Sequence, residues 1–335
     1  MLFRSGGAGC EEERAEGGRE QAADHGFAGV DLLEEGRFGS LVQGCREIKT
    51  TSRRGSTLRG GVAGGIMRGM RWNCCRLLGV WLGVAGLLPA ATFYCDPAQG
   101  SVARAGSAEQ PWGPLEEVIA RGLIEIRGAD GVVANPGAVV KAGDTVLLRD
   151  GYHGNIRIKA GYNEEFITIA AEAGHKPGVG QVVIDGGRRW RVKGLLVSPS
   201  LAPQPPERSP RHLVMLGEHG AEDSGWLEVE GCFVFSVPDA SSWSAQDWVN
   251  KPASGIWLGR HGRAHAARDN YILNTRMGID ICAPDCICEG NVIDGFSGDG
   301  MRVTRDGIQV RHNVIRNNFV GSNDGDDNHD DGIQS

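Results

Sequence analysis

The 335-residue sequence predicts an all-β solenoid, in which short strands stack as successive coils of about 22 residues. Two series of repeated residues favour this fold. Asparagines followed by two strand-forming residues recur at spacings of 21 and 22 residues, at Asn270, Asn291 and Asn313. Glycines that open short β-branched runs recur at spacings of 23 and 22 residues, at Gly255, Gly278 and Gly300. Within each repeat, apolar and polar residues alternate with a period of two and show no helical period.

Stacking explains why units this short can fold. A coil of about 22 residues cannot bury its own apolar side, whereas stacked coils share one continuous core. Asparagines at one corner of the stack are then expected to form a ladder of side-chain hydrogen bonds. A further copy begins at Gly332 after a ten-residue insertion, and the chain stops within it at Ser335. Because an open coil end exposes strand edges, we expect the domain to be truncated at its C-terminus.

Composition limits the classes of function. The chain has 42 acidic and 35 basic residues, a formal charge of −7, so it does not resemble a protein that binds nucleic acid through bulk positive charge. Hydrophobic residues make up 40% of the chain, which is too many for a fully disordered protein. The 52 glycines lack the three-residue period of collagen and indicate many turns.

The first part of the chain differs from the rest. Residues 1–66 show no sustained apolar period and are interpreted as a disordered or non-native extension. Residues 67–91 have arginines, an apolar run over 77–88 and then small residues, which is the pattern of a signal peptide. The alternative for that run is a buried helix or an uncleaved anchor. We therefore expect translation to start at Met67 or Met70, and a secreted or periplasmic protein without stable membrane insertion after cleavage.

Five cysteines fall in the remaining domain, residues 92–335: Cys95, Cys232, Cys282, Cys286 and Cys288. Export permits a disulfide between Cys282 and either Cys286 or Cys288, and three cysteines within seven residues also allow a metal site. The favoured interpretation is that they are small buried hydrophobic residues, because they occupy repeat positions that aliphatic residues fill elsewhere.

Two segments at the start of this domain carry a resemblance to a known family. Residues 93–97 (FYCDP) precede Gly106-Ser107 and Pro111-Trp112, and residues 141–152 read KAGDTVLLRDGY. With the repeats, they resemble the secreted right-handed parallel β-helix proteins, the pectate-lyase-like superfamily that includes alginate lyases, chondroitinase B and polygalacturonases. The resemblance implies a right-handed parallel β-helix over residues 92–335, with a short N-terminal capping helix around Leu115–Leu123 and substrate bound along an outer sheet face.

The strands and loops between the capping helix and the repeats are predicted from the local pattern of apolar residues and prolines. Two segments interrupt the coils: Pro199–Pro210 contains five prolines and is expected to form an extended loop, while Asp239–Ser254 is expected to hold a short helix beginning near Ser242. The alternating apolar runs predict strands at residues 155–159, 166–171, 181–185, 194–198 and 213–216.

The repeat alignment places polar residues in one column on the outer face. The position two residues after each opening glycine faces outward, which stacks Trp257, Asp280, Arg302 and Gln334 at about 4.8 Å per coil. Asp299 aligns with Asp331 in the same way. Trp257 is interpreted as a platform for stacking a sugar or else a surface aromatic, and Gln334 as a second substrate-binding residue. The histidines outside the acidic loop, His212 among them, are expected to lie in turns or on the surface.

The insertion at residues 323–331 (NDGDDNHDD) adds an acidic loop beside this column. Its carboxylates, Asp324, Asp326 and Asp327, are candidate ligands for calcium, which prefers oxygen donors. In a lyase, calcium would neutralise a uronate carboxylate, and Arg302, His329 or Arg305 would act as charge stabiliser or base in β-elimination, with histidine favoured as the base by its pKa.

Two other interpretations remain open. The residues Asp330-Asp331-Gly332 resemble the paired-aspartate motif of polygalacturonases, in which Asp280 or Asp299 would supply the other carboxylate for hydrolysis. Alternatively, the acidic loop is an ordinary solvated turn. We expect a monomeric protein that acts on or binds an acidic polysaccharide, as a lyase ahead of a hydrolase and both ahead of a non-catalytic glycan-binding or structural module.

Overall fold

A computed structural model of the chain describes residues 90–218, 224–319 and 331–335. The predicted extension, residues 1–66, and nearly all of the predicted signal peptide, residues 67–91, therefore lie outside the described residues. The strand β1 begins at Thr92, the first residue of the predicted domain. Among the described residues, no helix has both the length and the hydrophobicity needed to cross a membrane.

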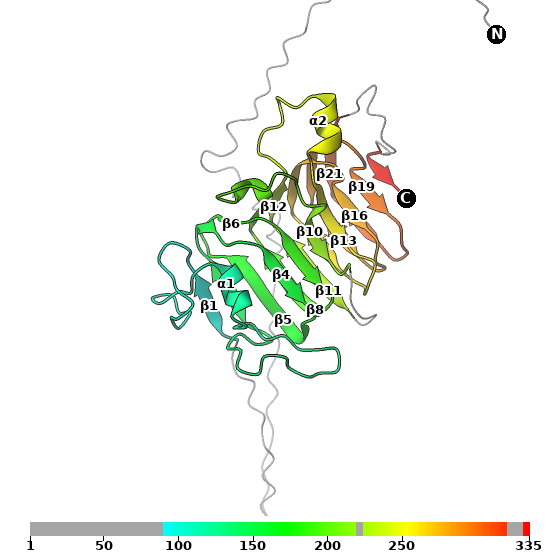
Figure 1. Cartoon of the computed structure of the whole chain (residues 1–335). Coiled ribbons are helices and arrows are strands. Elements are labelled where there is room, and N and C mark those ends of the chain that lie inside the picture. The colour runs from blue at the N-terminus through cyan, green and yellow to red at the C-terminus, as the bar shows by residue number, and fades with distance from the viewer. Residues whose placement is uncertain (1–89, 219–223, 320–330) are drawn as a thin grey trace, which may run out of the picture. The chain divides into compact units, whose positions relative to one another are not determined.

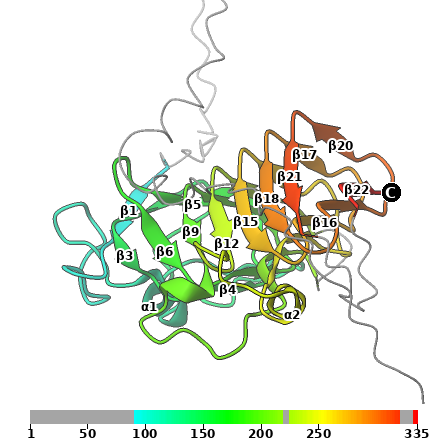
Figure 2. The ribbon, with the colours of Figure 1, turned by 90° about the horizontal axis from the view of Figure 1, so that it is seen from above.

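The described chain folds as a parallel β-helix with three sheets, and all strand pairs within them are parallel (Figure 1). From β2 onward, the strands enter the first, second and third sheet in strict rotation, so each coil contributes one strand to each sheet. Seen from above in Figure 2, the strands of successive coils stand side by side in chain order. The predicted fold class is thus confirmed.

The first sheet has eight strands: β1 (Thr92–Cys95), β2 (Thr145–Leu148), β5 (Tyr162–Ala171), β8 (Arg188–Lys193), β11 (Gly225–Glu230), β14 (Ala266–Arg268), β17 (Ile287–Glu289) and β20 (Gln309–Arg311). The second has seven: β3 (Gly151–Tyr152), β6 (Pro177–Val179), β9 (Leu196–Val197), β12 (Phe233–Phe235), β15 (Tyr271–Thr275), β18 (Val292–Phe296) and β21 (Val314–Asn318). The third also has seven: β4 (Ile156–Lys159), β7 (Val182–Asp185), β10 (His212–Leu216), β13 (Ser254–Leu258), β16 (Ile279–Ile281), β19 (Met301–Val303) and β22 (Ile333–Gln334).

The core runs through the inside of the coils and is built from the inward positions of the strands. In the third sheet, the residues on either side of Trp257 and Asp280 are Ile256, Leu258, Ile279 and Ile281, and all four are at most 1% exposed. This alternation follows from the strand period of two, which places Trp257 and Asp280 on the opposite, outer side.

An asparagine ladder joins the coils at the corner before the second sheet, as predicted. The Nδ2 atom of Asn270 donates to Oδ1 of Asn291 at 2.9 Å, and Nδ2 of Asn291 donates to Oδ1 of Asn313 at the same distance. Each acceptor oxygen also receives the backbone N–H of the preceding asparagine. The ladder therefore satisfies buried polar groups that the turn would otherwise leave without partners.

Glycine is required at the opposite corner, where the second sheet passes to the third. A Cβ atom on Gly278 would lie 2.3 Å from the carbonyl oxygen of Gly300 and 2.7 Å from Cγ2 of Ile293. Gly255 and Gly300 face the same restriction from the next coil. Glycine therefore recurs at this position because the backbones of neighbouring coils approach closely there. Backbone atoms cannot move aside for a side chain, so only glycine fits.

Two short helices lie outside the coils. Helix α1 (Leu115–Ala120) buries Leu115 and Val118 at the N-terminal end, as expected of the capping helix, although it ends before Leu123. Helix α2 (Ala245–Asn250) lies in the second interruption and starts with a capping box between Ser244 and Asp247. The first interruption begins with a 3-10 turn, η2 (Pro199–Leu201), and continues as a loop to strand β10.

The five cysteines of the domain are free thiols, and all of them are buried. Cys232, Cys286 and Cys288 are fully covered within the hydrophobic core. Burial raises the pKa of the Cys286 thiol to about 12, which keeps it protonated and unreactive near neutral pH. The interpretation of these residues as small buried hydrophobes is confirmed, and no predicted disulfide forms among them.

Candidate functional site

The predicted polar column forms on the outer face of the third sheet. The strand register pairs Met215 with Trp257, Trp257 with Asp280, Asp280 with Arg302, and Arg302 with Gln334. These residues come from five successive coils, so their Cα atoms stack at the spacing of neighbouring strands. Sequence alignment of the repeats was sufficient to predict this column.

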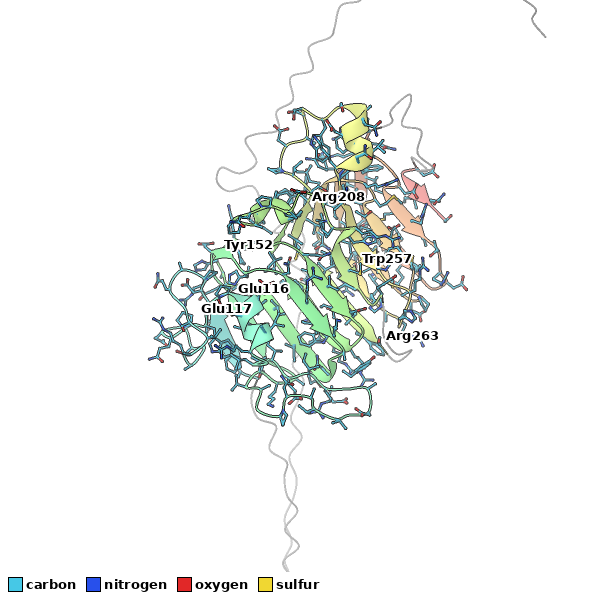
Figure 3. All side chains as sticks on the ribbon, in the orientation of Figure 1. Glu116, Glu117, Tyr152, Arg208, Trp257 and Arg263 are labelled. Atoms are coloured by element: carbon cyan, nitrogen blue, oxygen red, sulfur yellow. The ribbon has the colours of Figure 1, made fainter. Side chains whose placement is uncertain are left out.

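A cavity of about 780 Å³ lies over the column. Its floor includes Trp257, Asp280 and Arg302 from strands β13, β16 and β19. Figure 3 labels two lining residues, Arg208 and Trp257, which come from a loop and from the sheet. The full lining comprises Arg208, Ser209, Pro210, Arg211, His212, Asn250, Pro252, Ser254, Trp257, Arg260, Arg276, Met277, Asp280 and Arg302.

The two interruptions of the repeat build the wall of this cavity. Arg208 to Arg211 belong to the proline-rich segment before β10, and Asn250 and Pro252 follow helix α2. A hydrogen bond from Oγ of Ser209 to the carbonyl oxygen of Lys251, at 2.8 Å, connects the two segments. The insertions therefore add a wall beside the outer sheet face and form an open cavity, which the sequence pattern alone did not predict.

Asp280 is the central acidic residue of the cavity. It is 4% exposed, and its Oδ1 atom has no hydrogen-bond partner among the described residues. Burial raises the pKa of this carboxyl to about 6; the charge of Asp299 raises it further, whereas Arg302 and Arg211 lower it. A buried carboxylate with an unpaired oxygen costs folding free energy. Its position on the floor of the cavity therefore marks Asp280 as a functional candidate.

His212 is a site residue that the sequence interpretation missed. It was expected in a turn or on the surface, but it begins strand β10, is 3% exposed, and lies with Nε2 at 3.9 Å from Oδ2 of Asp280. Burial lowers the pKa of His212 to about 4, with a further contribution from Arg211, so its ring is neutral near pH 7. Its position in the repeat could have identified it. His212 lies one residue before the position of the opening glycine, as Asp299 and Asp331 do in later coils.

Asp299 lies behind the column and holds Arg302. Its side chain is completely buried, and Oδ2 accepts a hydrogen bond from Nε of Arg302 at 3.1 Å. The same Nε donates to Oε1 of Gln334 at 2.7 Å. Burial raises the pKa of Asp299. Because it is covered, Asp299 positions Arg302 and does not reach the cavity itself, whereas Asp331 on the next coil is exposed.

Trp257 is neither an open stacking platform nor a surface aromatic, so the predicted exposure of its ring is wrong. The side chain is 7% exposed. The ring of His212 lies 4.9 Å from it, the guanidinium of Arg260 lies 5.7 Å from its ring centre, and Nε1 donates to Oε2 of Glu218 at 2.7 Å. The preceding coil and the strand ends cover the ring, because an outward position on a sheet can still be enclosed by neighbouring loops.

The cationic residues that line the cavity are all arginines: Arg208, Arg211, Arg260, Arg276 and Arg302. Among the described residues, no carboxylate forms an ion pair with Arg208, Arg211 or Arg260. The cavity thus concentrates positive charge although the whole chain is acidic. Guanidinium groups recognise carboxylate and other planar oxyanions through paired hydrogen bonds, so the site suits an anionic ligand.

Five predicted residues of the acidic loop lie outside the described residues: Asp324, Asp326, Asp327, His329 and Asp330. Their assignment to calcium binding or catalysis stays a prediction. Within the described part of the chain, no group of three or more histidine, cysteine, aspartate or glutamate residues is arranged to hold a metal ion.

The sequence matches no protein-family model and no curated protein. Among solved structures, a pectate lyase, Pel9A, aligns with a TM-score of 0.42 and 13% identity over 66% of this chain and 56% of that chain. A rhamnogalacturonan lyase aligns with a TM-score of 0.41 and 12% identity over 65% of this chain and 62% of that chain. This chain thus spans less than two thirds of either structure, and its fold assignment rests on its own strand pairing.

Proposed function

We propose that this protein is a lyase that cleaves an acidic polysaccharide containing uronic acid residues. The observation that carries the proposal is Asp280, a buried carboxylate with an unpaired oxygen and a raised pKa, in a cavity whose other charged residues are arginines. This arrangement combines one proton-handling group with several groups that neutralise an anion.

Binding follows from the arginines. A polyanionic chain approaching the cavity is attracted by Arg208 and Arg211 on the wall and by Arg260 and Arg302 above the sheet. Pairing a uronate carboxylate with a guanidinium withdraws its negative charge, which makes the hydrogen on the adjacent carbon more acidic. Arg302 is suited to this role because Asp299 and Gln334 fix its Nε atom.

The chemical step is β-elimination. The carboxylate of Asp280 removes the hydrogen from the carbon next to the uronate carboxylate, and the electron pair forms a double bond to the neighbouring ring carbon. The bond from that carbon to the glycosidic oxygen breaks, and this oxygen takes a proton from water. With its pKa raised to about 6, Asp280 is a stronger base than an ordinary carboxylate and is still ionised at neutral pH.

A glycoside hydrolase is the second candidate, and the same raised pKa favours it. A carboxyl group that stays protonated up to about pH 6 is suited to donate a proton to a leaving glycosidic oxygen. Asp331, which is exposed two coils further along the sheet, would then be the carboxylate that activates water. In this reaction the bond is broken by water and no double bond forms.

Three further parts of the proposal come from the sequence: the protein is exported, it binds calcium, and it is a monomer. Secretion or transport to the periplasm would bring the protein to polysaccharides outside the cell. Calcium held by Asp324, Asp326 and Asp327 would assist the arginines in neutralising the substrate. These parts are independent of the role of Asp280 and are tested separately, by N-terminal sequencing, metal analysis and light scattering.

The decisive experiment incubates the full chain with polygalacturonate, alginate and chondroitin. A lyase produces unsaturated ends that absorb ultraviolet light, together with new reducing ends, and the Asp280→Asn variant should lose both while retaining affinity for the polymer. Glu165→Gln, which changes an exposed carboxylate on β5, is the matched control and should remain active. Reducing ends without the absorbance would favour hydrolysis. Binding without either product would leave a non-catalytic glycan-binding module.

A further inference from the structure

A second, smaller hollow adjoins the main cavity. Its volume is about 260 Å³, and it is lined by Trp257, Arg260, Cys282, Arg302, Thr304 and Arg305. Trp257, Arg260 and Arg302 also line the main cavity, so the two spaces meet over these residues. The main cavity includes residues at the amino ends of strands β10 and β13, whereas the smaller hollow includes residues that follow the carboxyl ends of β13, β16 and β19.

Three of the six residues that line this hollow are arginines, and none of the six carries a carboxylate. Each arginine is held by a contact outside the hollow or at its edge. Arg260 lies over the ring of Trp257, Nε of Arg302 is fixed by Asp299 and Gln334, and Nη1 of Arg305 donates to the carbonyl oxygen of Thr304 at 2.9 Å. These contacts hold the three arginines around one small space, and although Asp299 partly balances the charge of Arg302, the like charges still repel.

An anion in the hollow would relieve this repulsion. Arginine binds oxyanions through paired hydrogen bonds, whereas lysine acts as a point charge, and every cationic residue of the lining is an arginine. The hollow is a third of the size of the main cavity, so it has room for a charged substituent together with part or all of the sugar ring that carries it.

We propose that the hollow bordered by Arg260, Arg302 and Arg305 is an oxyanion subsite. It binds an anionic substituent, a sulfate ester or a carboxylate, on the sugar next to the one held in the main cavity. This assignment rests on the proposed function for its natural ligand. The binding chemistry of the subsite is nevertheless testable with inorganic sulfate, independently of any polysaccharide.

The first experiment measures the midpoint of thermal unfolding in sodium sulfate and in sodium chloride at equal ionic strength. Sulfate should stabilise the wild-type chain, and Arg305→Ala should weaken the apparent sulfate affinity about tenfold, the loss expected for one charge-assisted pair of hydrogen bonds. Because Arg305 is exposed, this substitution should leave the fold intact. Arg208→Ala removes the same charge from the main cavity only and should retain most of the sulfate effect.

Equal losses in the two variants, or no sulfate effect in the wild type, would overturn the subsite. A second experiment identifies the source of the anion by comparing chondroitin with chondroitin sulfate, which differ in the sulfate ester. A larger affinity loss for the sulfated polymer in Arg305→Ala assigns the subsite to sulfate, and equal losses on both polymers assign it to a carboxylate. If the sulfate ion binds at the hollow but no acidic polymer binds to the protein, the subsite stands and the proposed function fails.

Discussion

The Nε2 atom of His212 lies 3.9 Å from Oδ2 of Asp280, although strand β13 separates their two strands in the sheet. Burial shifts the two pKa values in opposite directions, to about 4 for His212 and about 6 for Asp280. Burial disfavours the charged form of each group, which is the cation of His212 and the anion of Asp280, and therefore lowers one pKa and raises the other. The pair thus lies in a desolvated part of the site.

The first prediction concerns the stability of Asp280→Asn. The pKa of Asp280 rises from an ordinary value of 3.8 to about 6 on folding, so the folded chain binds more protons than the unfolded chain between these values. The contribution of Asp280 to stability is therefore present below about pH 4 and lost as the pH rises through 6. Asp280→Asn lacks this loss, so we expect its free energy of unfolding to exceed that of the wild type by roughly 3 kcal/mol at pH 7.

Urea unfolding of both proteins at pH 4 and pH 7 measures this difference. At pH 4 the gain of the variant over the wild type should be small, because the wild-type carboxyl is protonated in the folded state and only about half ionised in the unfolded state. A variant that is less stable than the wild type at pH 7 would contradict the assignment of Asp280 as a desolvated carboxylate.

The second prediction is the sign of the pH dependence of cleavage. If Asp280 is the base of an elimination, kcat/KM should rise with pH and reach half of its maximum near pH 6, because the base must be ionised. If Asp280 is the acid of a hydrolase, kcat/KM should fall through the same pH. Steady-state rates between pH 4 and pH 8 distinguish the two. Glu165→Gln should give the wild-type profile, and a profile flat across pH 6 would remove Asp280 from either role.

The third prediction concerns the asparagine ladder. Asn291 is fully buried and makes hydrogen bonds to Asn270, Asn313 and the carbonyl oxygen of Ala267. Asn291→Ala leaves several of these buried groups unsatisfied, and we expect a loss of about 3 kcal/mol in the free energy of unfolding. Asn313→Ala should cost less, because that residue is only partly buried. Denaturant titration of the two variants makes the comparison, and the reverse order would show that the ladder contributes little.

The fourth prediction compares two glycines of one column. Gly278→Ala places a Cβ atom 2.3 Å from the carbonyl oxygen of Gly300, so the neighbouring coil must shift, and we expect a loss of about 2 kcal/mol or more. At Gly332 a Cβ atom would meet no atom of the described residues within 4 Å. Gly332→Ala should therefore be nearly neutral in thermal unfolding. Similar losses at both positions would mean that coil spacing does not require glycine here.

Local repeats were sufficient to predict the coils, the asparagine ladder and the outer column of Trp257, Asp280, Arg302 and Gln334. Each of these features depends only on the period of the chain and on the alternation of strand faces, which residue spacing determines directly. The pairing of Asp299 with Asp331 in one column follows from the same period, and Asp331 N–H indeed lies 3.4 Å from Oδ1 of Asp299.

Tertiary structure decided which parts of that column form a site. The sequence places Arg208 in a proline-rich interruption, with nothing in its spacing to relate it to Asp280, and the repeat position of His212 does not reveal that its ring lies beside that carboxylate. The interruptions contribute Arg208 and Arg211 to the cavity lining, while the folded coils bury Trp257 and Asp280. Spacing along the chain determines which residues stack, but exposure, charge and pKa depend on whatever covers the stack, and only the folded chain determines that.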